Sequence, residues 1–170
     1  MLKGKTALVT GSTRGIGEAA ARTLAAQGCN IMMNGFGDAD DIEAKRAQIE
    51  AESGSTVRYH DADLSDEKQL DDLVDCAETA FGGIDILVNN AVIRYFHTVD
   101  DFDRDNWRHA LSVNVTAPFF LMQRVLPGMR KRGWGRIINM ASVLGLGARG
   151  GRADYVTSKT AIIGLTRAVA

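Results

Sequence analysis

The sequence has few cysteines and no excess of charge of either sign. Only Cys29 and Cys76 occur in 170 residues, and they do not form a CxxC pair. They provide no disulfide framework, and we expect buried, reduced thiols in a cytoplasmic protein without a metal site. Lys and Arg total 20 against 21 Asp and Glu, a net charge of −1. Without a basic excess to neutralise phosphates, we expect no nucleic-acid partner.

Long apolar runs are also absent. No stretch approaches the roughly 20 residues that a helix needs to cross a bilayer, so we expect no membrane span. Residues 1–5 lead directly into an apolar strand and do not resemble a signal peptide. With 45% hydrophobic residues the chain is too apolar for a disordered one. We therefore expect a single domain over residues 1–170.

Strand and helix patterns alternate along the chain. Apolar runs predict strands over residues 6–10, 29–33, 56–61, 84–88 and 136–140. Helical spacing predicts helices over residues 17–27, 40–52, 65–81, 103–132 and from 154 onward, with Ser65 at the start of the third. This alternation predicts a doubly wound α/β fold, with a parallel sheet covered by helices on both faces. Because the last pattern is still helical at residue 170, we expect a C-terminally incomplete chain.

A glycine-rich turn follows the first strand. It reads Gly11-Ser12-Thr13-Arg14-Gly15-Ile16-Gly17. Small residues let the backbone approach a pyrophosphate, and the helix N-terminus supplies amides and the positive end of its dipole. The spacing is G-x-x-x-G-x-G rather than the better-known G-x-G-x-x-G. The turn predicts a dinucleotide site, and the alternative is a turn that only permits tight packing.

Tyr155 and Lys159 are four residues apart on the last predicted helix and therefore share one face. A phenol, with a reference pKa of about 10, is a poor base at neutral pH. A lysine ammonium nearby favours the phenolate, which makes the pair a candidate general acid and base. Ser142 follows the strand at 136–140, where its hydroxyl is placed to bond a substrate oxygen. The alternatives are a surface Tyr–Lys pair and a serine that only opens a loop.

In this order, the motifs resemble those of the short-chain dehydrogenase/reductase family along the whole chain. The glycine turn is followed at the family's spacing by Asp63, Asn89-Asn90-Ala91, Asn114, Ser142, Tyr155 and Lys159. The resemblance implies a nicotinamide cofactor and a catalytic tetrad of Asn114, Ser142, Tyr155 and Lys159. Tyr155 would exchange a proton with the substrate oxygen while hydride passes between the nicotinamide and the substrate carbon.

The resemblance also implies cofactor contacts and an assembly. Asp63 would meet the adenine, and Lys159 would hold the nicotinamide ribose. Members of the family commonly form dimers or tetramers. They also carry a further strand and a substrate lid after the last predicted helix. Because neither is present in this sequence, one alternative is that the 170-residue form has no activity. The implied cofactor-binding residues are Gly11, Ser12, Thr13, Arg14, Gly15, Ile16, Gly17, Phe36, Asp63, Leu64, Asn90, Ala91, Tyr155 and Lys159.

Two local features bear on the helix and the cofactor cleft. Pro118 stands four residues after Asn114 and lacks the N–H that would bond the Asn114 carbonyl. We therefore predict a kink in the helix of residues 103–132, with its hydrogen bonding interrupted at Asn114 and a carbonyl able to hold a water. The alternative is a proline near the start of a helix. Val92 stands where the family usually has glycine, and we expect ordinary strand backbone angles there.

The choice between NAD and NADP is open, with NAD favoured. Asp38, Asp40 and Asp41 follow the second strand and would repel a 2′-phosphate. Arg14 favours NADP, because some NADP users of the family carry a basic residue just before this glycine.

A closer resemblance is to bacterial 3-hydroxybutyrate dehydrogenases, on residues 34–38 and 133–142. Arg152 stands where that subfamily has a carboxylate-binding lysine, and a guanidinium also forks onto a carboxylate. Arg94 and Leu144 replace the usual glutamine and histidine, which favours a small hydroxy or keto acid larger or more apolar than hydroxybutyrate. The alternatives are an NADPH-dependent 3-oxoacyl thioester reductase and a dinucleotide-binding protein without turnover. The predicted substrate-binding residues are Arg94, Ser142, Leu144, Arg152 and Tyr155.

Overall fold

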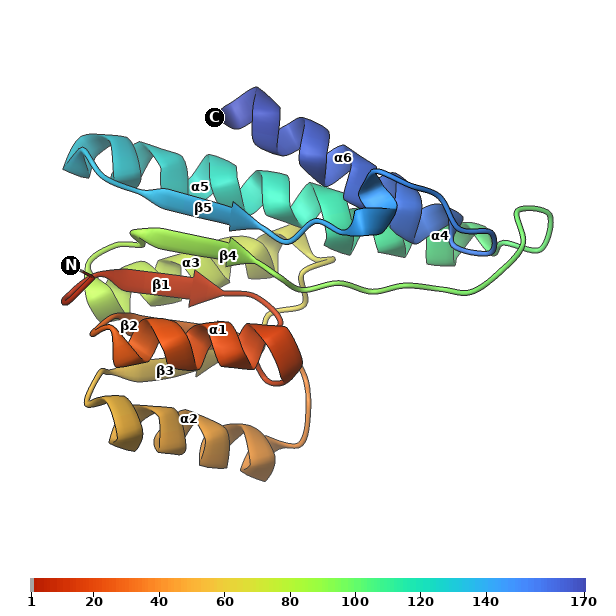
Figure 1. Cartoon of the computed structure of the whole chain (residues 1–170). Coiled ribbons are helices and arrows are strands. Elements are labelled where there is room, and N and C mark those ends of the chain that lie inside the picture. The colour runs from red at the N-terminus through yellow and green to blue at the C-terminus, as the bar shows by residue number, and fades with distance from the viewer. Residues whose placement is uncertain (1) are drawn as a thin grey trace.

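The computed structural model describes residues 2–170 and places a parallel sheet between two layers of helices (Figure 1). Five strands lie in the order β3-β2-β1-β4-β5, and every neighbouring pair is parallel. The strands are β1 (Thr6–Val9), β2 (Asn30–Asn34), β3 (Val57–His60), β4 (Ile86–Asn89) and β5 (Arg136–Asn139). The helices are α1 (Gly15–Ala26), α2 (Ala39–Ser53), α3 (Glu67–Phe81), α4 (Arg104–Leu111), α5 (Ala117–Arg132) and α6 (Ala153–Val169). The predicted doubly wound α/β fold is confirmed.

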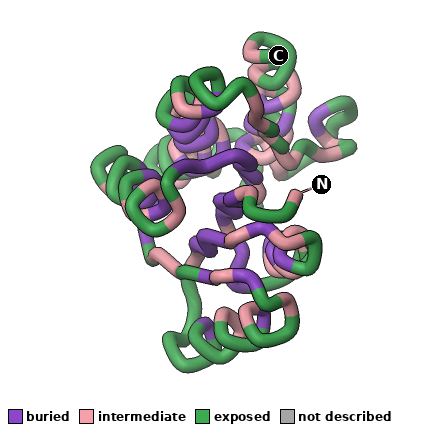
Figure 2. The backbone as a smooth tube through the Cα atoms, turned by 90° about the vertical axis from the view of Figure 1, so that its left-hand side faces the viewer, coloured by how far each residue is buried: buried purple, intermediate pink, exposed green. Residues whose placement is uncertain are grey.

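The two faces of the sheet bury two apolar clusters. Leu8 of β1 packs in one cluster with residues of α3 and α5, whereas its neighbours Ala7 and Val9 pack in the other with α1 and α2. This alternation follows from the strand's two-residue period. Figure 2 shows buried backbone concentrated in the sheet, with exposed backbone on the outer faces of the helices. The runs without polar positions therefore mark strands that are covered on both faces.

The start of α3 corrects one prediction. Asp66, not Ser65, caps this helix, because the Asp66 carboxylate accepts hydrogen bonds from the Lys68 and Gln69 backbone N–H groups. The Ser65 hydroxyl instead donates to Asp63 Oδ1 at 2.8 Å. Ser65 and Asp66 are both favourable N-cap residues. Because the Ser65 hydroxyl is used in the turn with Asp63, Asp66 becomes the N-cap.

The long helix predicted over residues 103–132 is interrupted, as Pro118 indicated. A π-helical turn, Ser112–Thr116, separates α4 from α5, and the Ala117 N–H donates to Ser112 O, five residues back. Pro118 lies in the first turn of α5, where its missing N–H is tolerated best. The regular α-helical hydrogen bonding is thus interrupted ahead of Pro118, whereas the kink and a water at the Asn114 carbonyl stay predictions.

The sheet order brings three loops to one end of the molecule. The chain winds outward from β1 through β2 to β3, and then returns to place β4 on the other side of β1. At this reversal, the loops that follow β1, β4 and β5 leave the carboxyl ends of adjacent strands (Figure 1). A crevice outside the carboxyl ends at such a reversal is where open α/β sheets bind ligands.

Two glycines in helices provide a matched test of this packing. A Cβ on Gly17 would lie 2.3 Å from the Gly11 carbonyl oxygen, whereas nothing lies within 4 Å of a Cβ on Gly164. We expect Gly17→Ala to lower the free energy of unfolding by about 1–3 kcal/mol through overpacking. Gly164→Ala should raise it by about 0.5–1 kcal/mol, because alanine favours the helix. Urea unfolding measures both, and equal effects would contradict the close approach at Gly17.

Candidate active site

The glycine turn lies directly against the end of β4. Gly11 has φ +62°, and a Cβ there would approach Ala91 Cα to 2.8 Å. The Asn90 side-chain amide donates to the carbonyl oxygens of Thr10 at 3.0 Å and Gly11 at 3.1 Å. Thr10 Oγ1 in turn accepts from the Asn90 and Ala91 N–H groups. Asn90 and Thr10 together thus hold the turn against the end of β4.

Two features of the turn fit a pyrophosphate. Arg14 occupies the N-cap position of α1, and its side chain makes no capping hydrogen bond, so the first N–H groups of α1 receive no side-chain acceptor. Gly15 has φ +59°, and nothing lies within 4 Å of the position of a Cβ there. Uncapped amides beside open space are what a phosphate needs at a helix N-terminus.

The other polar residues of the turn bind the backbone that follows β2. The Ser12 N–H donates to Asn34 O at 2.7 Å, and the Thr13 hydroxyl donates to Phe36 O at 2.9 Å. Both side chains are buried. They were predicted as cofactor contacts, and in this structure they fix the shape of the turn.

The other residues predicted to bind the cofactor differ in the solvent exposure of their side chains. Ile16 and Phe36 are well exposed beside the turn, whereas Leu64 is buried in the core. Asp63 Oδ1 accepts from both the N–H and the hydroxyl of Ser65, each at 2.8 Å. Of these residues, Ile16 and Phe36 thus offer exposed side chains, whereas Leu64 is packed in the core and Asp63 is bonded to Ser65.

The charges near the turn have both signs. Asp38 caps α2, since its Oδ1 accepts from the N–H groups of Asp40 and Asp41. Lys45, which the motif analysis missed, extends from α2 and donates to Thr13 O at 3.0 Å. Arg14 is exposed. The start of α2 thus carries the capping carboxylate of Asp38, whereas Arg14 and Lys45 bring positive charge to the glycine turn.

Tyr155 and Lys159 are adjacent on α6, as their spacing predicts. Lys159 Nζ lies 5.8 Å from the centroid of the Tyr155 ring and donates to Met140 O. The side chain of Lys159 is 4% exposed, and this burial lowers the pKa of its ammonium. Met140 directly follows β5, so the lysine joins α6 to the end of that strand.

The Ser142 loop is packed closely against α6. Ser142 Oγ accepts from Leu144 N at 3.2 Å and caps a short 3₁₀ turn, Val143–Gly145, which leaves its hydroxyl proton free to donate. A Cβ on Gly145 would lie 2.8 Å from Lys159 O, and Thr160 Oγ1 donates to Gly145 O. Gly145 and Thr160 thus hold the serine loop against the helix. Their only sequence signal was a glycine within a glycine-rich loop.

Asn114 lies in the π-helical turn, and its side chain is committed to protein partners. It is 2% exposed. Its Oδ1 accepts from Ile93 N at 2.9 Å, and its Nδ2 donates to Ile93 O at 2.8 Å and to Ser158 Oγ at 3.3 Å. The amide therefore links the segment after β4 to α6. A catalytic contribution through the backbone carbonyl of Asn114 stays a prediction.

Of the predicted substrate-binding residues, Arg152 lines a hollow beside residues 96–98, whereas Arg94, Ser142, Leu144 and Tyr155 are not among its lining residues. The Arg152 guanidinium lies over the Phe96 ring, 4.0 Å from its centroid. Among residues 2–170, neither Arg94 nor Arg152 forms an ion pair. A hollow of about 320 Å³ is lined by Phe96, His97, Thr98, Arg149, Gly150, Gly151 and Arg152.

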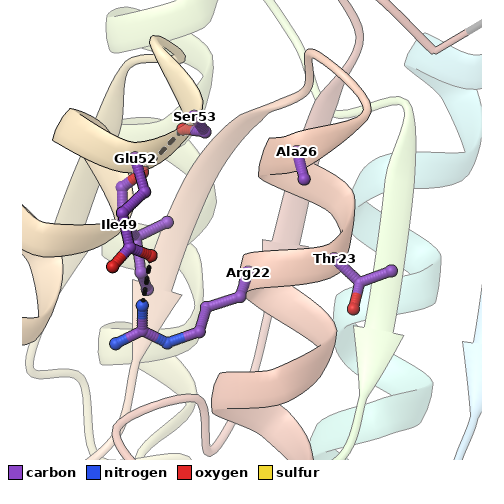
Figure 3. A pocket seen from close by; sticks show the side chains of 6 residues that line it. All are labelled: Arg22, Thr23, Ala26, Ile49, Glu52 and Ser53. Atoms are coloured by element: carbon purple, nitrogen blue, oxygen red, sulfur yellow. Dashed lines mark hydrogen bonds and ion pairs between the residues drawn. The ribbon is translucent and has the colours of Figure 1, made fainter.

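The backbone at Val92 is not in the strained region, and the hollow between α1 and α2 contains an ion pair. Every described non-glycine residue has negative φ, so Val92 avoids the strained region as expected, although it lies beyond the end of β4. The hollow between α1 and α2 has a volume of about 290 Å³, and Figure 3 shows Arg22 reaching across it to Glu52. Arg22 also pairs with Glu18, which leaves its charge compensated.

Within residues 2–170, no three His, Cys, Asp or Glu side chains are grouped so that they could hold a metal ion. No helix of the described chain combines the length and apolarity that a membrane span requires.

Comparison with known proteins gives consistent matches. The family model for short chain dehydrogenases matches residues 5–170. The chain is 48% identical over its whole length to a D-beta-hydroxybutyrate dehydrogenase of Cupriavidus necator, and 43% identical over 98% of its length to one of Rhizobium meliloti. It spans 65% and 64% of the length of these relatives. A solved metagenomic short-chain oxidoreductase in complex with NADP is 32% identical, with a TM-score of 0.93, over 99% of this chain and 76% of that one.

The buried lysine has a measurable consequence for stability. Because burial lowers the pKa of Lys159 from its ordinary value of 10.5, the unfolded chain binds this proton more tightly than the folded one. The free energy of unfolding should therefore gain a positive slope as the pH rises through the folded pKa toward 10.5. Lys159→Met should remove that slope in urea unfolding between about pH 7 and about pH 10. Lys131→Met, an exposed control on α5, should keep it, and equal slopes in all three proteins would contradict the shift.

Proposed function

The chain belongs to the short chain dehydrogenase family, and on that premise we propose that it transfers hydride between a nicotinamide dinucleotide and a secondary alcohol or ketone. The observation that carries the proposal is the buried Lys159 ammonium beside Tyr155, tied to the end of β5. A protein that only binds dinucleotides has no need of this pair. The geometry therefore favours an enzyme over a binding protein without turnover.

The protein side of the reaction is acid–base chemistry. In the reducing direction, the Tyr155 hydroxyl gives its proton to the substrate oxygen, and the nearby ammonium of Lys159 favours the resulting phenolate. The Ser142 hydroxyl, held by the 3₁₀ turn, donates a hydrogen bond to the same substrate oxygen. A bound nicotinamide supplies or accepts the hydride.

The dinucleotide would lie at the reversal between β1 and β4, with its pyrophosphate at the N–H groups of Gly15, Ile16 and Gly17. We infer NAD as the preferred cofactor, because Asp38, Asp40 and Asp41 lie at the start of α2 directly after β2. Lys45 and Arg14 favour NADPH, and with it a 3-oxoacyl thioester reductase as the second candidate. Titration of NADH and NADPH, followed by nicotinamide fluorescence, distinguishes the two.

The substrate we propose is a small hydroxy or keto acid of the 3-hydroxybutyrate type. Two guanidiniums without an ion pair among the described residues support this proposal: Arg94 within the segment after β4 and Arg152 at the start of α6. Leu144 adds apolar surface near Ser142. Two similar proteins are named D-beta-hydroxybutyrate dehydrogenases. A cytoplasmic homodimer or homotetramer stays a prediction.

Tyr155→Phe tests the proposed acid and base. Removing the hydroxyl should lower kcat/KM by about 10²–10⁴-fold, the usual contribution of a general acid or base. The measurement is NADH absorbance over a panel of 3-keto and 3-hydroxy acids, and turnover that survives the substitution would remove Tyr155 from this role.

Arg152→Ala tests recognition of the anion. We expect kcat/KM for keto acids to fall by about 10- to 150-fold, equivalent to about 1.5–3 kcal/mol for a hydrogen bond to a charged group. The methyl esters of the same acids should be turned over as by the unmodified protein. Arg167→Ala, at the far end of α6, is the control and should change neither value. Equal losses for acid and ester would contradict carboxylate binding by Arg152.

A further inference from the structure

The chain leaves β4 as an extended segment without helix or strand, residues 91–98. Figure 1 shows it running from the end of β4 to the part of the molecule that holds α4 and the start of α6. Exposure alternates along it with the two-residue period of extended backbone. The exposed members are Val92, Arg94 and Phe96, and the partly buried ones are Ala91, Ile93 and Tyr95. Arg94 therefore projects from the open side of the segment.

Two buried side chains hold this segment by its backbone. Asn114 bonds both the N–H and the carbonyl of Ile93. Asp154 Oδ2 accepts from the Tyr95 N–H at 2.9 Å. These contacts lie on either side of Arg94, so the position of its Cα depends on both.

Asp154, the second residue of α6, is unusual in its burial rather than in its position, because acidic residues are common in the first turn of a helix. Its side chain is 0% exposed, and no hydrogen-bond partner lies at its Oδ1 among the described residues. Burying a carboxylate with one bond is unfavourable, although the N-terminal end of α6 offsets part of the cost. Among residues 2–170, the bond from Tyr95 is the one hydrogen bond that the Asp154 carboxylate accepts from another segment.

The same bond joins the two walls of the hollow beside Arg152. One wall is residues 96–98 and the other is residues 149–152. Tyr95 directly precedes the first wall, and Asp154 lies two residues after the second. The stack of Arg152 on Phe96 crosses between the walls at the open side. The spacing of Arg94 from Arg152 thus depends on the bond between Tyr95 and Asp154.

We propose that Asp154 is a positioning residue, which holds segment 91–98 against the first turn of α6 so that Arg94 and Arg152 keep the spacing that an anionic substrate requires. The proposal rests on the proposed function, in which these two arginines bind the substrate. Asp154 itself touches neither substrate nor cofactor. The oxygen that accepts from Tyr95 is what matters, so a neutral side chain with the same acceptor should serve.

Asp154→Ala and Asp154→Asn separate this role from a general effect on stability. In Asp154→Ala, we expect hydrogen exchange of the Tyr95 amide, measured on peptides spanning residues 91–98, to become about 10- to 100-fold faster. KM for keto acids should rise by about 10-fold, with kcat within about 3-fold of the unmodified value, because the anion contact is lost and the acid–base pair is intact. Asp154→Asn keeps the acceptor and should restore both values to within about 3-fold.

Asp85 is a control at the opposite end of the strands, and it differs from Asp154 in its ion pairs with Arg132 and Lys5. It is also buried, and its Oδ2 accepts from the Thr6 backbone N–H at 3.1 Å. Asp85→Ala should lower the free energy of unfolding and leave both the exchange of the Tyr95 amide and KM unchanged. A rise of KM in this variant would show that any loss of a buried carboxylate has the same effect, and would overturn the assignment.

Two other results would also overturn the proposal. One is exchange of the Tyr95 amide in Asp154→Ala within about 2-fold of the unmodified protein, which means that Asp154 does not hold the segment. The other is faster exchange with an unchanged KM for acids, which means that holding the segment does not position the arginines. A failure of the proposed function looks different, because the unmodified protein then turns over no acid. The exchange rates alone then decide whether Asp154 holds the segment.

Discussion

The candidate site depends on one contact, the hydrogen bond from the buried Lys159 ammonium to the carbonyl of Met140. An ammonium that is buried without a partner is strongly unfavourable, so this bond requires α6 to dock where β5 ends. Docking α6 there brings Tyr155 and the loop of Ser142 to the same end of the sheet. Burial is unfavourable for the ammonium and lowers the pKa of Lys159. The same burial holds the side chain in one place beside the Tyr155 phenol.

The rest of the site is built on backbone contacts made by small or amide side chains. Gly11 lets the first turn touch Ala91, and Asn90 bonds the carbonyls of that turn. Asn114 and Asp154 then hold the segment beyond Ala91 at two points. Several polar side chains that the sequence offers as ligand-binding groups therefore form hydrogen bonds within the protein instead. The groups left for ligands are the N–H groups of α1, the hydroxyls of Ser142 and Tyr155, and the guanidiniums of Arg94 and Arg152.

Patterns of neighbouring residues predicted the helices and strands well wherever a single feature, such as an apolar run or a proline, was decisive. Apolar runs located all five strands to within a few residues, and Pro118 located the break between α4 and α5. The prediction was wrong at Ser65, where two neighbouring capping residues competed and the turn at Asp63 favoured Asp66. For the candidate site, helical spacing placed Tyr155 and Lys159 together, but no pattern indicated that Asn114 would bond Ile93 or that Lys45 would reach Thr13.

The sequence by itself determined what depends on neighbours along the chain: the period of each element, the break at Pro118 and the shared face of Tyr155 and Lys159. The tertiary structure alone decided the partners of the buried polar groups. Tyr95 and Asp154 are 59 residues apart, and Thr13 and Lys45 are 32 apart. Such pairs form only after helices and strands have packed, since a hydrogen bond requires its atoms within about 3 Å and local spacing does not specify that distance across the fold.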